Sequence, residues 1–146
     1  MTATGPTAPF DVSIHRLSAD RPLGAAIHPS GKSARPTGQD IAVQIPTLKA
    51  SVPLDNKLLA SLPRDRFDRL LPNLASVNLP QGLVLNEAGD EVDQIYFPHN
   101  GMLSLLVVLR DGKAIETATV GREGAVGAMA GLGLHKSLVR VVVQMP

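Results

Sequence analysis

The residues with the clearest potential for chemistry lie in one glycine-rich segment, GREGAVGAMAGLGLHKS, at 121–137. Glycine lets backbone N–H groups approach an anion, so such a segment could bind phosphate. A P-loop, however, needs glycine directly before Lys136-Ser137, where His135 stands, and the dinucleotide-binding spacing of glycines is also broken. We therefore interpret these glycines as turn and close-packing positions. The alternative is a remodelled anion pocket built from Arg122, Lys136, Ser137 or Arg140.

Other patterns give little support for catalysis. The sequence has no cysteine, which excludes disulfides, thiolate metal sites and cysteine nucleophiles. No two of the four histidines have a metal-ligand spacing such as HxH or HExxH. The acidic run Asp90, Glu91 and Asp93 is interpreted as a solvated turn, because Ile95-Tyr96-Phe97 interrupts the alternating oxygen ligands of a calcium loop. We expect no cofactor and no enzyme activity.

Size, composition and charge favour one domain. A chain of 146 residues with 44% hydrophobic and 3% aromatic residues would build a core mainly from aliphatic side chains. A net charge of +1 gives no broad positive field for nucleic acid. The absence of a run of about 18 apolar residues argues against a membrane-spanning helix. The first ten residues lack the basic start of an export signal, so we expect a cytoplasmic protein.

Proline and glycine interrupt the first third of the chain. Residues 1–53 show no sustained apolar period, which predicts a flexible tail before a domain at 54–146. Within the tail, Ile41 to Ile45 could form a short strand or dock on the domain.

Two short helices are predicted next. Asp55 is a candidate N-cap for a helix over NKLLASL. In the following PRDRFDRLLPNL, the apolar residues recur at helical spacing, and Pro72 should end or kink the helix.

Short strands separated by turns are predicted after Leu74, an order typical of an all-β sandwich or roll. Asp111-Gly112 predicts a two-residue β-hairpin turn. In the last strand, Val139, Val141 and Val143 share one face. Because no later strand covers it, we expect an open sheet edge and a half-covered core. The predicted strands are Ser76 to Leu79, Leu83 to Asn86, Gln94 to Phe97, Met102 to Leu109, Ala114 to Val120 and Leu138 to Met145.

From about Asp55 onward, this order of elements resembles the N-terminal sensory domain of Crp/Fnr-type transcription regulators. The resemblance rests on G-D-x-x-x-x-I-Y-F at Gly89 to Phe97 and on VGREGAVG at Val120 to Gly127. It implies a mainly β, double-stranded β-roll (jelly-roll-like, cyclic-nucleotide-binding-like) with short N-terminal helices, incomplete at the C-terminus. The implied function is a sensory domain that binds a small effector or acts without one.

The resemblance also implies a ligand site, at which this sequence departs from the family. Ala128 stands where ligand-binding members carry the glutamate that accepts from the ribose, so we expect a small anionic effector that need not be cyclic AMP. The arginine–serine pair that holds the phosphate is represented only by Lys136-Ser137 or by Arg140. The candidate ligand-binding residues are Arg122, Gly127, Ala128, Lys136, Ser137 and Arg140.

Full-length relatives continue into a dimerisation helix and a helix-turn-helix. We therefore expect DNA contact only through a missing C-terminal domain, and homodimers or heterodimers with a full-length regulator as partners. Two alternatives stay open: an interaction module that pairs with a full-length regulator, and a cupin-like metal enzyme.

Overall fold

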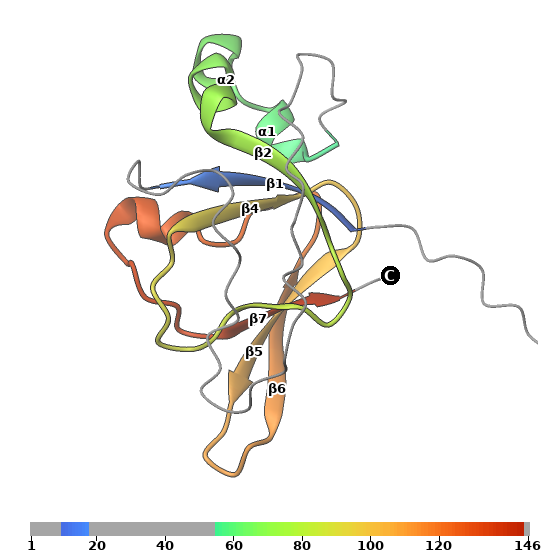
Figure 1. Ribbon diagram of the computed structural model, residues 1–146, viewed down its shortest axis with the longest axis vertical. Helices are drawn as coiled ribbons and strands as arrows, with labels where there is room; N and C mark the ends of the chain where they lie inside the picture. Colours follow the sequence, from blue (N-terminus) through green and yellow to red (C-terminus); the bar gives the residue numbers. More distant parts are fainter. Residues whose placement is uncertain (1–9, 18–54, 145–146) are drawn as a thin grey trace, which may run out of the picture.

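Two antiparallel sheets face each other in the computed structural model, which describes residues 10–17 and 55–144 (Figure 1). One sheet has the strand order β2-β1-β4 and the other has the order β3-β7-β5-β6. The strands are β1 (Phe10–Arg16), β2 (Leu74–Leu79), β3 (Val84–Asn86), β4 (Gln94–Pro98), β5 (Met102–Val108), β6 (Ala114–Val120) and β7 (Arg140–Gln144). The prediction of a mainly β, jelly-roll-like fold is confirmed.

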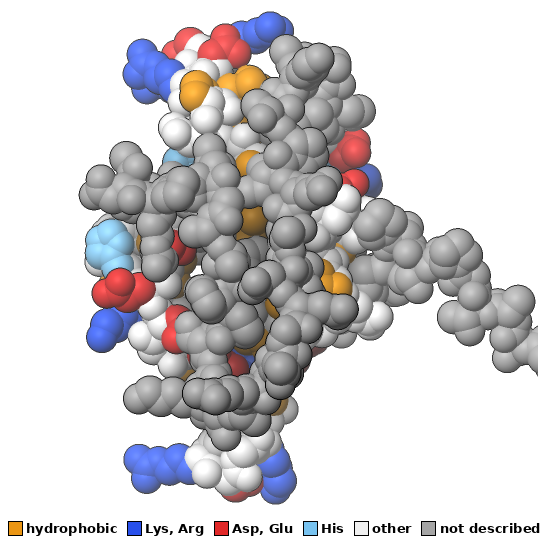
Figure 2. Space-filling view, viewed as in Figure 1, with side chains coloured by type: hydrophobic (Ala, Val, Ile, Leu, Met, Phe, Trp, Pro, Cys, Tyr) orange, Lys and Arg blue, Asp and Glu red, His pale blue; other side chains and the backbone are white. Residues whose placement is uncertain are grey.

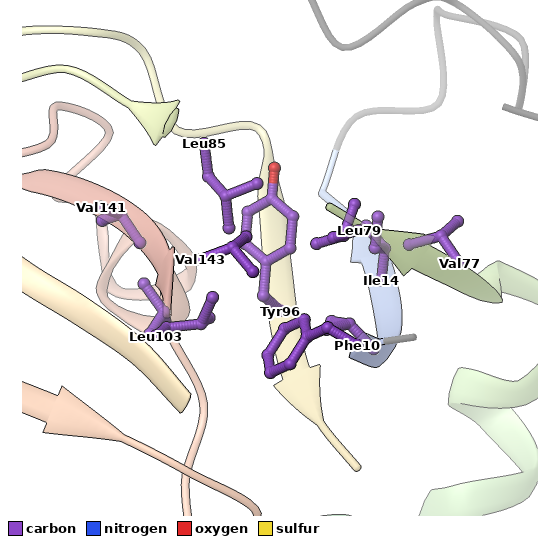
Figure 3. Close-up of a cluster of buried hydrophobic side chains, with 11 residues drawn as sticks. Phe10, Ile14, Val77, Leu79, Leu85, Tyr96, Leu103, Val141 and Val143 are labelled. Atoms are coloured by element: carbon purple, nitrogen blue, oxygen red, sulfur yellow. The ribbon is translucent and has the colours of Figure 1, made fainter. Parts of the chain in front are cut away.

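The main hydrophobic core lies between the sheets and takes side chains from both. Tyr96 of β4 lies among aliphatic side chains of β3, β7 and the neighbouring strands (Figure 3). The predicted shared face of the last strand is confirmed for Val141 and Val143, which are both buried, whereas Val139 is half-buried and precedes β7. The buried members are Phe10, Val12, Ile14, Val77, Leu79, Leu85, Tyr96, Leu103, Val126, Val141 and Val143.

Short helices cover the other side of the first sheet. They are α1 (Lys57–Ala60), α2 (Arg64–Leu70) and the 3-10 turn η1 (Leu71–Asn73). The α-helix ends two residues before Pro72, which agrees with the prediction that this proline ends or kinks it. Their apolar side chains form a second cluster with β2 and β4. Its buried members are Leu59, Leu74 and Phe97.

The residue that caps α1 is Asn56, so the prediction of Asp55 as the N-cap is wrong. The Asn56 side chain accepts a hydrogen bond from the Leu59 backbone N–H at 3.0 Å. Its Nδ2 donates to the Pro98 and Gly124 carbonyls, each at 2.9 Å. Asp55 is exposed, whereas Asn56 is fully buried and joins the helix to β4 and to the turn after β6.

The prediction of a flexible tail is wrong for Phe10–Arg16, which form β1 in the middle of the first sheet. Phe10, Val12 and Ile14 alternate with polar residues and are buried in the main core. This period of two follows directly after Pro9, and the many neighbouring prolines and glycines concealed it. The segment Ile41 to Ile45 and the other tail residues at 1–9 and 18–53 lie outside the described residues.

The last strand is not an open edge, contrary to the prediction. β7 pairs with β3 on one side and with β5 on the other. The inner face of β7 is also covered, contrary to the prediction, because β1 lies in the facing sheet and contributes three buried apolar side chains to the core.

The β5–β6 hairpin forms where it was expected, but its loop differs from the predicted two-residue turn. Leu109 N–H donates to the Lys113 carbonyl at 2.7 Å, which closes the loop around residues 110–112. Gly112 has φ +84°, as a three-residue loop with a left-handed last position requires. Basic and acidic side chains gather at this tip and, at the opposite end of the molecule, over the helices (Figure 2).

Within residues 10–17 and 55–144, no helix has the length and apolar character needed to cross a membrane.

Two histidines, the half-buried His15 of β1 and the buried His99 beside it, should make stability depend on pH. Burial lowers the pKa of His15 and His99 from 6.5, although Asp11 and Asp55 partly oppose this for His99. The unfolded chain therefore binds protons at a pH at which the folded chain does not. We expect the free energy of unfolding to fall as the pH drops below about 6.5, and to continue falling until the lowered pKa values are passed.

Urea unfolding between pH 8 and pH 5 measures this dependence. His99→Gln should reduce it, whereas His135→Gln, at an exposed position, should leave it unchanged. If the stability of both variants depended equally on pH, His99 would not be a source of this dependence.

Candidate functional site

The candidate site is formed by residues 126–137, which lie antiparallel to residues 89–96. Tyr96 and Val126 exchange two backbone hydrogen bonds, of 2.8 and 3.0 Å. Further along, Val92 N–H donates to the His135 carbonyl at 2.7 Å, and Ser137 N–H donates to the Asp90 carbonyl at 2.8 Å. The segment is therefore held at both ends, and the 3-10 turn η2 (Ala128–Leu132) protrudes between them.

Left-handed glycines lie on either side of η2. Gly127 has φ +93° and Gly133 has φ +96°. A Cβ atom on Gly127 would lie 2.3 Å from the Gln94 carbonyl oxygen, so the two backbones can approach only without a side chain there. At these two positions the interpretation as turn and close-packing glycines is confirmed.

Gly127→Ala should destabilise the fold far more than Gly89→Ala. Both glycines have similar positive φ, but a Cβ on Gly89 would have no atom within 4 Å. We expect Gly89→Ala to cost about 1–2 kcal/mol from backbone strain, and Gly127→Ala to cost about 1–3 kcal/mol more from the collision. Urea unfolding of both variants measures the difference, and equal losses would contradict the close approach.

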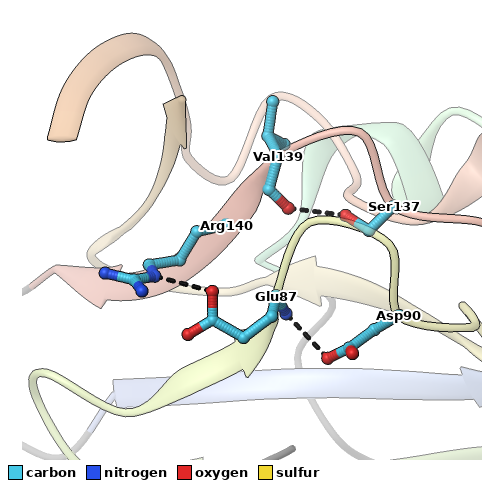
Figure 4. A network of polar contacts seen from close by, with 5 residues as sticks. All are labelled: Glu87, Asp90, Ser137, Val139 and Arg140. Atoms are coloured by element: carbon cyan, nitrogen blue, oxygen red, sulfur yellow. Dashed lines mark hydrogen bonds and ion pairs between the residues drawn. The ribbon is translucent and has the colours of Figure 1, made fainter. Parts of the chain in front are cut away.

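A polar network lies at the far end of the site, between β3 and β7 (Figure 4). Arg140 Nε donates to Glu87 Oε2 at 2.8 Å, and both side chains are about two-thirds buried, with exposed fractions of 33% and 30%. Asp90 Oδ2 accepts from the Glu87 backbone N–H at 2.8 Å. The Ser137 hydroxyl donates to the Val139 carbonyl at 2.7 Å. The Arg140 charge and the Ser137 proton are thus already engaged within the protein.

The structure brings some of the predicted site residues together and separates others. Lys136, Ser137 and Arg140 lie beside residues 87–91, since Lys136 forms a β-bridge with Glu91. Gly127 and the exposed Ala128 lie at the start of η2.

Arg122 has different surroundings. It is exposed in the turn after β6, and its carbonyl accepts from Lys57 N–H of α1 at 2.7 Å. In the same turn, a hydrogen bond from the Gly121 backbone N–H lowers the pKa of the Glu123 carboxyl.

Glu87 is a site residue that the sequence did not reveal. It follows β3 directly, and its partner Arg140 begins β7, 53 positions later. A carboxylate at the end of a strand was the available signal, but only the β3–β7 pairing places it against arginine. With Asp90 and Glu91, three carboxylates adjoin two cations, Lys136 and Arg140, so this end of the site has no positive excess.

The comparisons with known proteins agree with this architecture. Residues 76–146, slightly less than half of the chain, match the model of the cyclic nucleotide-binding domain family. The fold is that of a cyclic nucleotide-binding domain. The match includes strands β3 to β7, most of β2, η2 and the polar network, and β1 lies outside it.

A solved structure has a similar fold. It is described as the crystal structure of the N-terminal domain of a transcriptional regulator from Streptomyces coelicolor A3(2). The TM-score is 0.54 at 21% sequence identity, and the alignment covers 64% of this chain and 69% of that one. No curated protein gives a match.

The polar groups of the site are paired with one another and do not form a metal centre in the described residues. In the part of the chain that the structure describes, no three His, Asp or Glu side chains form a group that could hold a metal ion. The polar atoms of the site are hydrogen-bonded to one another and to backbone groups.

Proposed function

We propose that this chain is a non-catalytic, cytoplasmic sensory module of a Crp/Fnr-type transcription regulator, and that its effector is a small molecule other than a cyclic nucleotide. The observation that carries the proposal is the glycine-flanked turn η2, held against β4 inside the segment that matches the cyclic nucleotide-binding domain. With a net charge of +1, the chain lacks a broad positive field, so we assign DNA contact to another domain.

Three features argue against cyclic AMP as the effector. Ala128 offers a methyl group where the family resemblance places a carboxylate for the ribose hydroxyl. The Arg140 guanidinium is paired with Glu87, and the Ser137 hydroxyl donates to a backbone carbonyl. A cyclic phosphate would have to displace the Glu87 carboxylate from a partly buried pair, which costs interaction energy before any is gained.

Thermal unfolding with added ligand tests the proposal. A ligand that binds only the folded chain raises the melting temperature, and a concentration 100 times its Kd adds about 2.7 kcal/mol of stability. We expect 1 mM cyclic AMP or cyclic GMP to leave the melting temperature unchanged. A saturable rise with either nucleotide would overturn the proposed ligand class.

Glu87→Gln provides a sharper version of the test, because it removes the charge that neutralises Arg140. We expect this variant to bind inorganic phosphate more tightly than the wild type does, with a Kd at least about tenfold lower, as expected for a charge-assisted bond. Glu116→Gln is the matched control at an exposed position of β6. If both variants bound phosphate with equal affinity, Arg140 would not be part of the proposed site.

A further inference from the structure

β1 lies between β2 and β4, and among the described strands it is the one that joins them in the sheet order β2-β1-β4. It pairs antiparallel with both neighbours, from Phe10↔Leu79 to His15↔Leu74 on one side and from Val12↔Pro98 to Arg16↔Gln94 on the other. Without β1, both facing edges would lose their hydrogen-bond partners, and the core would lose Phe10, Val12 and Ile14, which are 1%, 0% and 8% exposed. The strand therefore fills a groove bounded by β2 and β4.

The contacts that hold β1 are those of a bound extended peptide. Main-chain hydrogen bonds run along both edges, and apolar side chains enter the core at alternate positions, which is how strand addition works in peptide recognition. Polar groups of β1 make three further hydrogen bonds to residues that directly follow β4. Ser13 Oγ lies 2.6 Å from His99 Nε2, His99 N–H donates to the Asp11 carbonyl at 2.9 Å, and Asp11 N–H donates to Asn100 Oδ1 at 2.7 Å.

The position of β1 in the sequence sets it apart from the other strands. Strands β2 to β7 follow one another between Leu74 and Gln144, whereas β1 precedes α1 by 40 residues, at 17–56. β1 also lies outside residues 76–146, the segment that matches the cyclic nucleotide-binding domain. The groove is thus made by the contiguous part of the chain and is filled by a separate segment.

We propose that the groove between β2 and β4 is a strand-acceptor site, that residues 10–16 are its own-chain ligand, and that this ligand is exchangeable. The site takes an extended segment with apolar side chains at alternate positions, antiparallel to both β2 and β4. Attachment to the same chain raises the effective concentration of the ligand, which keeps the groove filled without requiring an intrinsically tight contact. This assignment is independent of the proposed effector site.

The test uses the full chain with a site-specific protease sequence inserted after Gly38, so that β1 can be disconnected from the folded chain. After cleavage, we expect the N-terminal fragment to co-elute with the rest in size-exclusion chromatography. The cleaved protein is then incubated with a fluorescein-labelled peptide of residues 10–17. The incubation contains urea at a concentration at which unfolding just begins, so that the bound fragment dissociates fast enough for the peptide to replace it. We expect saturable incorporation of the peptide, measured by fluorescence anisotropy.

A Val12→Asp version of the peptide is the matched control, and its affinity should be at least about tenfold weaker because its carboxylate would enter the core. If cleavage unfolds the protein and excess wild-type peptide restores the β-sheet spectrum, the proposal is also supported. Three results would overturn it: a large fragment that keeps its stability after the small one has left, no incorporation of the wild-type peptide, or equal affinity for both peptides.

Discussion

Replacing Val12 by aspartate should abolish cooperative folding or reduce the free energy of unfolding by at least about 4 kcal/mol. Val12 is 0% exposed at the centre of β1, with strands paired on both sides. The substitution removes a buried aliphatic side chain and puts a carboxylate in the core between the sheets. Because small domains are stable by only about 5–15 kcal/mol, this loss is a large part of the total.

Ile115→Asp is the matched control for Val12→Asp. Ile115 is also a β-branched residue within a strand, but it lies on β6 and is 51% exposed. We expect it to cost about 1 kcal/mol or less. Urea unfolding followed by circular dichroism measures both variants. If Val12→Asp proved as mild as Ile115→Asp, β1 would not occupy the centre of the first sheet.

Replacing Asn56 by alanine should cost about 3 kcal/mol. The side chain is fully buried and makes three hydrogen bonds to backbone groups of α1, β4 and the turn after β6. Alanine leaves the Pro98 and Gly124 carbonyls and the Leu59 N–H without these partners. The loss should therefore exceed that of an ordinary helix cap, which is about 1 kcal/mol.

Asn56→Asp separates the two functions of this side chain. Aspartate can still cap α1, but it cannot donate to the two carbonyls and would place a negative charge against them. We expect Asn56→Asp to destabilise the fold at least as much as alanine does, whereas Asn78→Ala, at an exposed position of β2, should have little effect. If the Asn56→Asp variant were as stable as the wild type, the hydrogen bonds to the Pro98 and Gly124 carbonyls would not contribute to stability, and Asn56 would act only as a helix cap.

The helices and the strands after Leu74 were predictable because their signals are local. The predicted hairpin strands at 102–109 and 114–120 agree with β5 and β6 to within one residue, since β-branched and aliphatic runs there end at a glycine turn. The end of α2 at Leu70, two residues before Pro72, follows from the proline itself. The likeness to a cyclic-nucleotide-binding-like β-roll came from two such local segments, at residues 89–97 and 120–127, and its fold is confirmed.

Choices between similar neighbouring residues depended on distant atoms. Asp55 and Asn56 are both good helix caps by type. Asn56 is the cap because its amide also reaches the carbonyls of Pro98 and Gly124, which lie 42 and 68 positions away.

The sequence by itself determined where the chain extends, turns and coils after Leu74, because periodicity, glycine and proline act over a few residues. Only the tertiary structure decided which strands are neighbours. It placed Phe10–Arg16 between β2 and β4. It also paired β7, which we expected at an open edge, with strands on both sides, and it brought Glu87 into contact with Arg140. Strand pairing joins backbone groups that every residue carries, so partners far apart in sequence are selected by how the buried side chains of both sheets fit together.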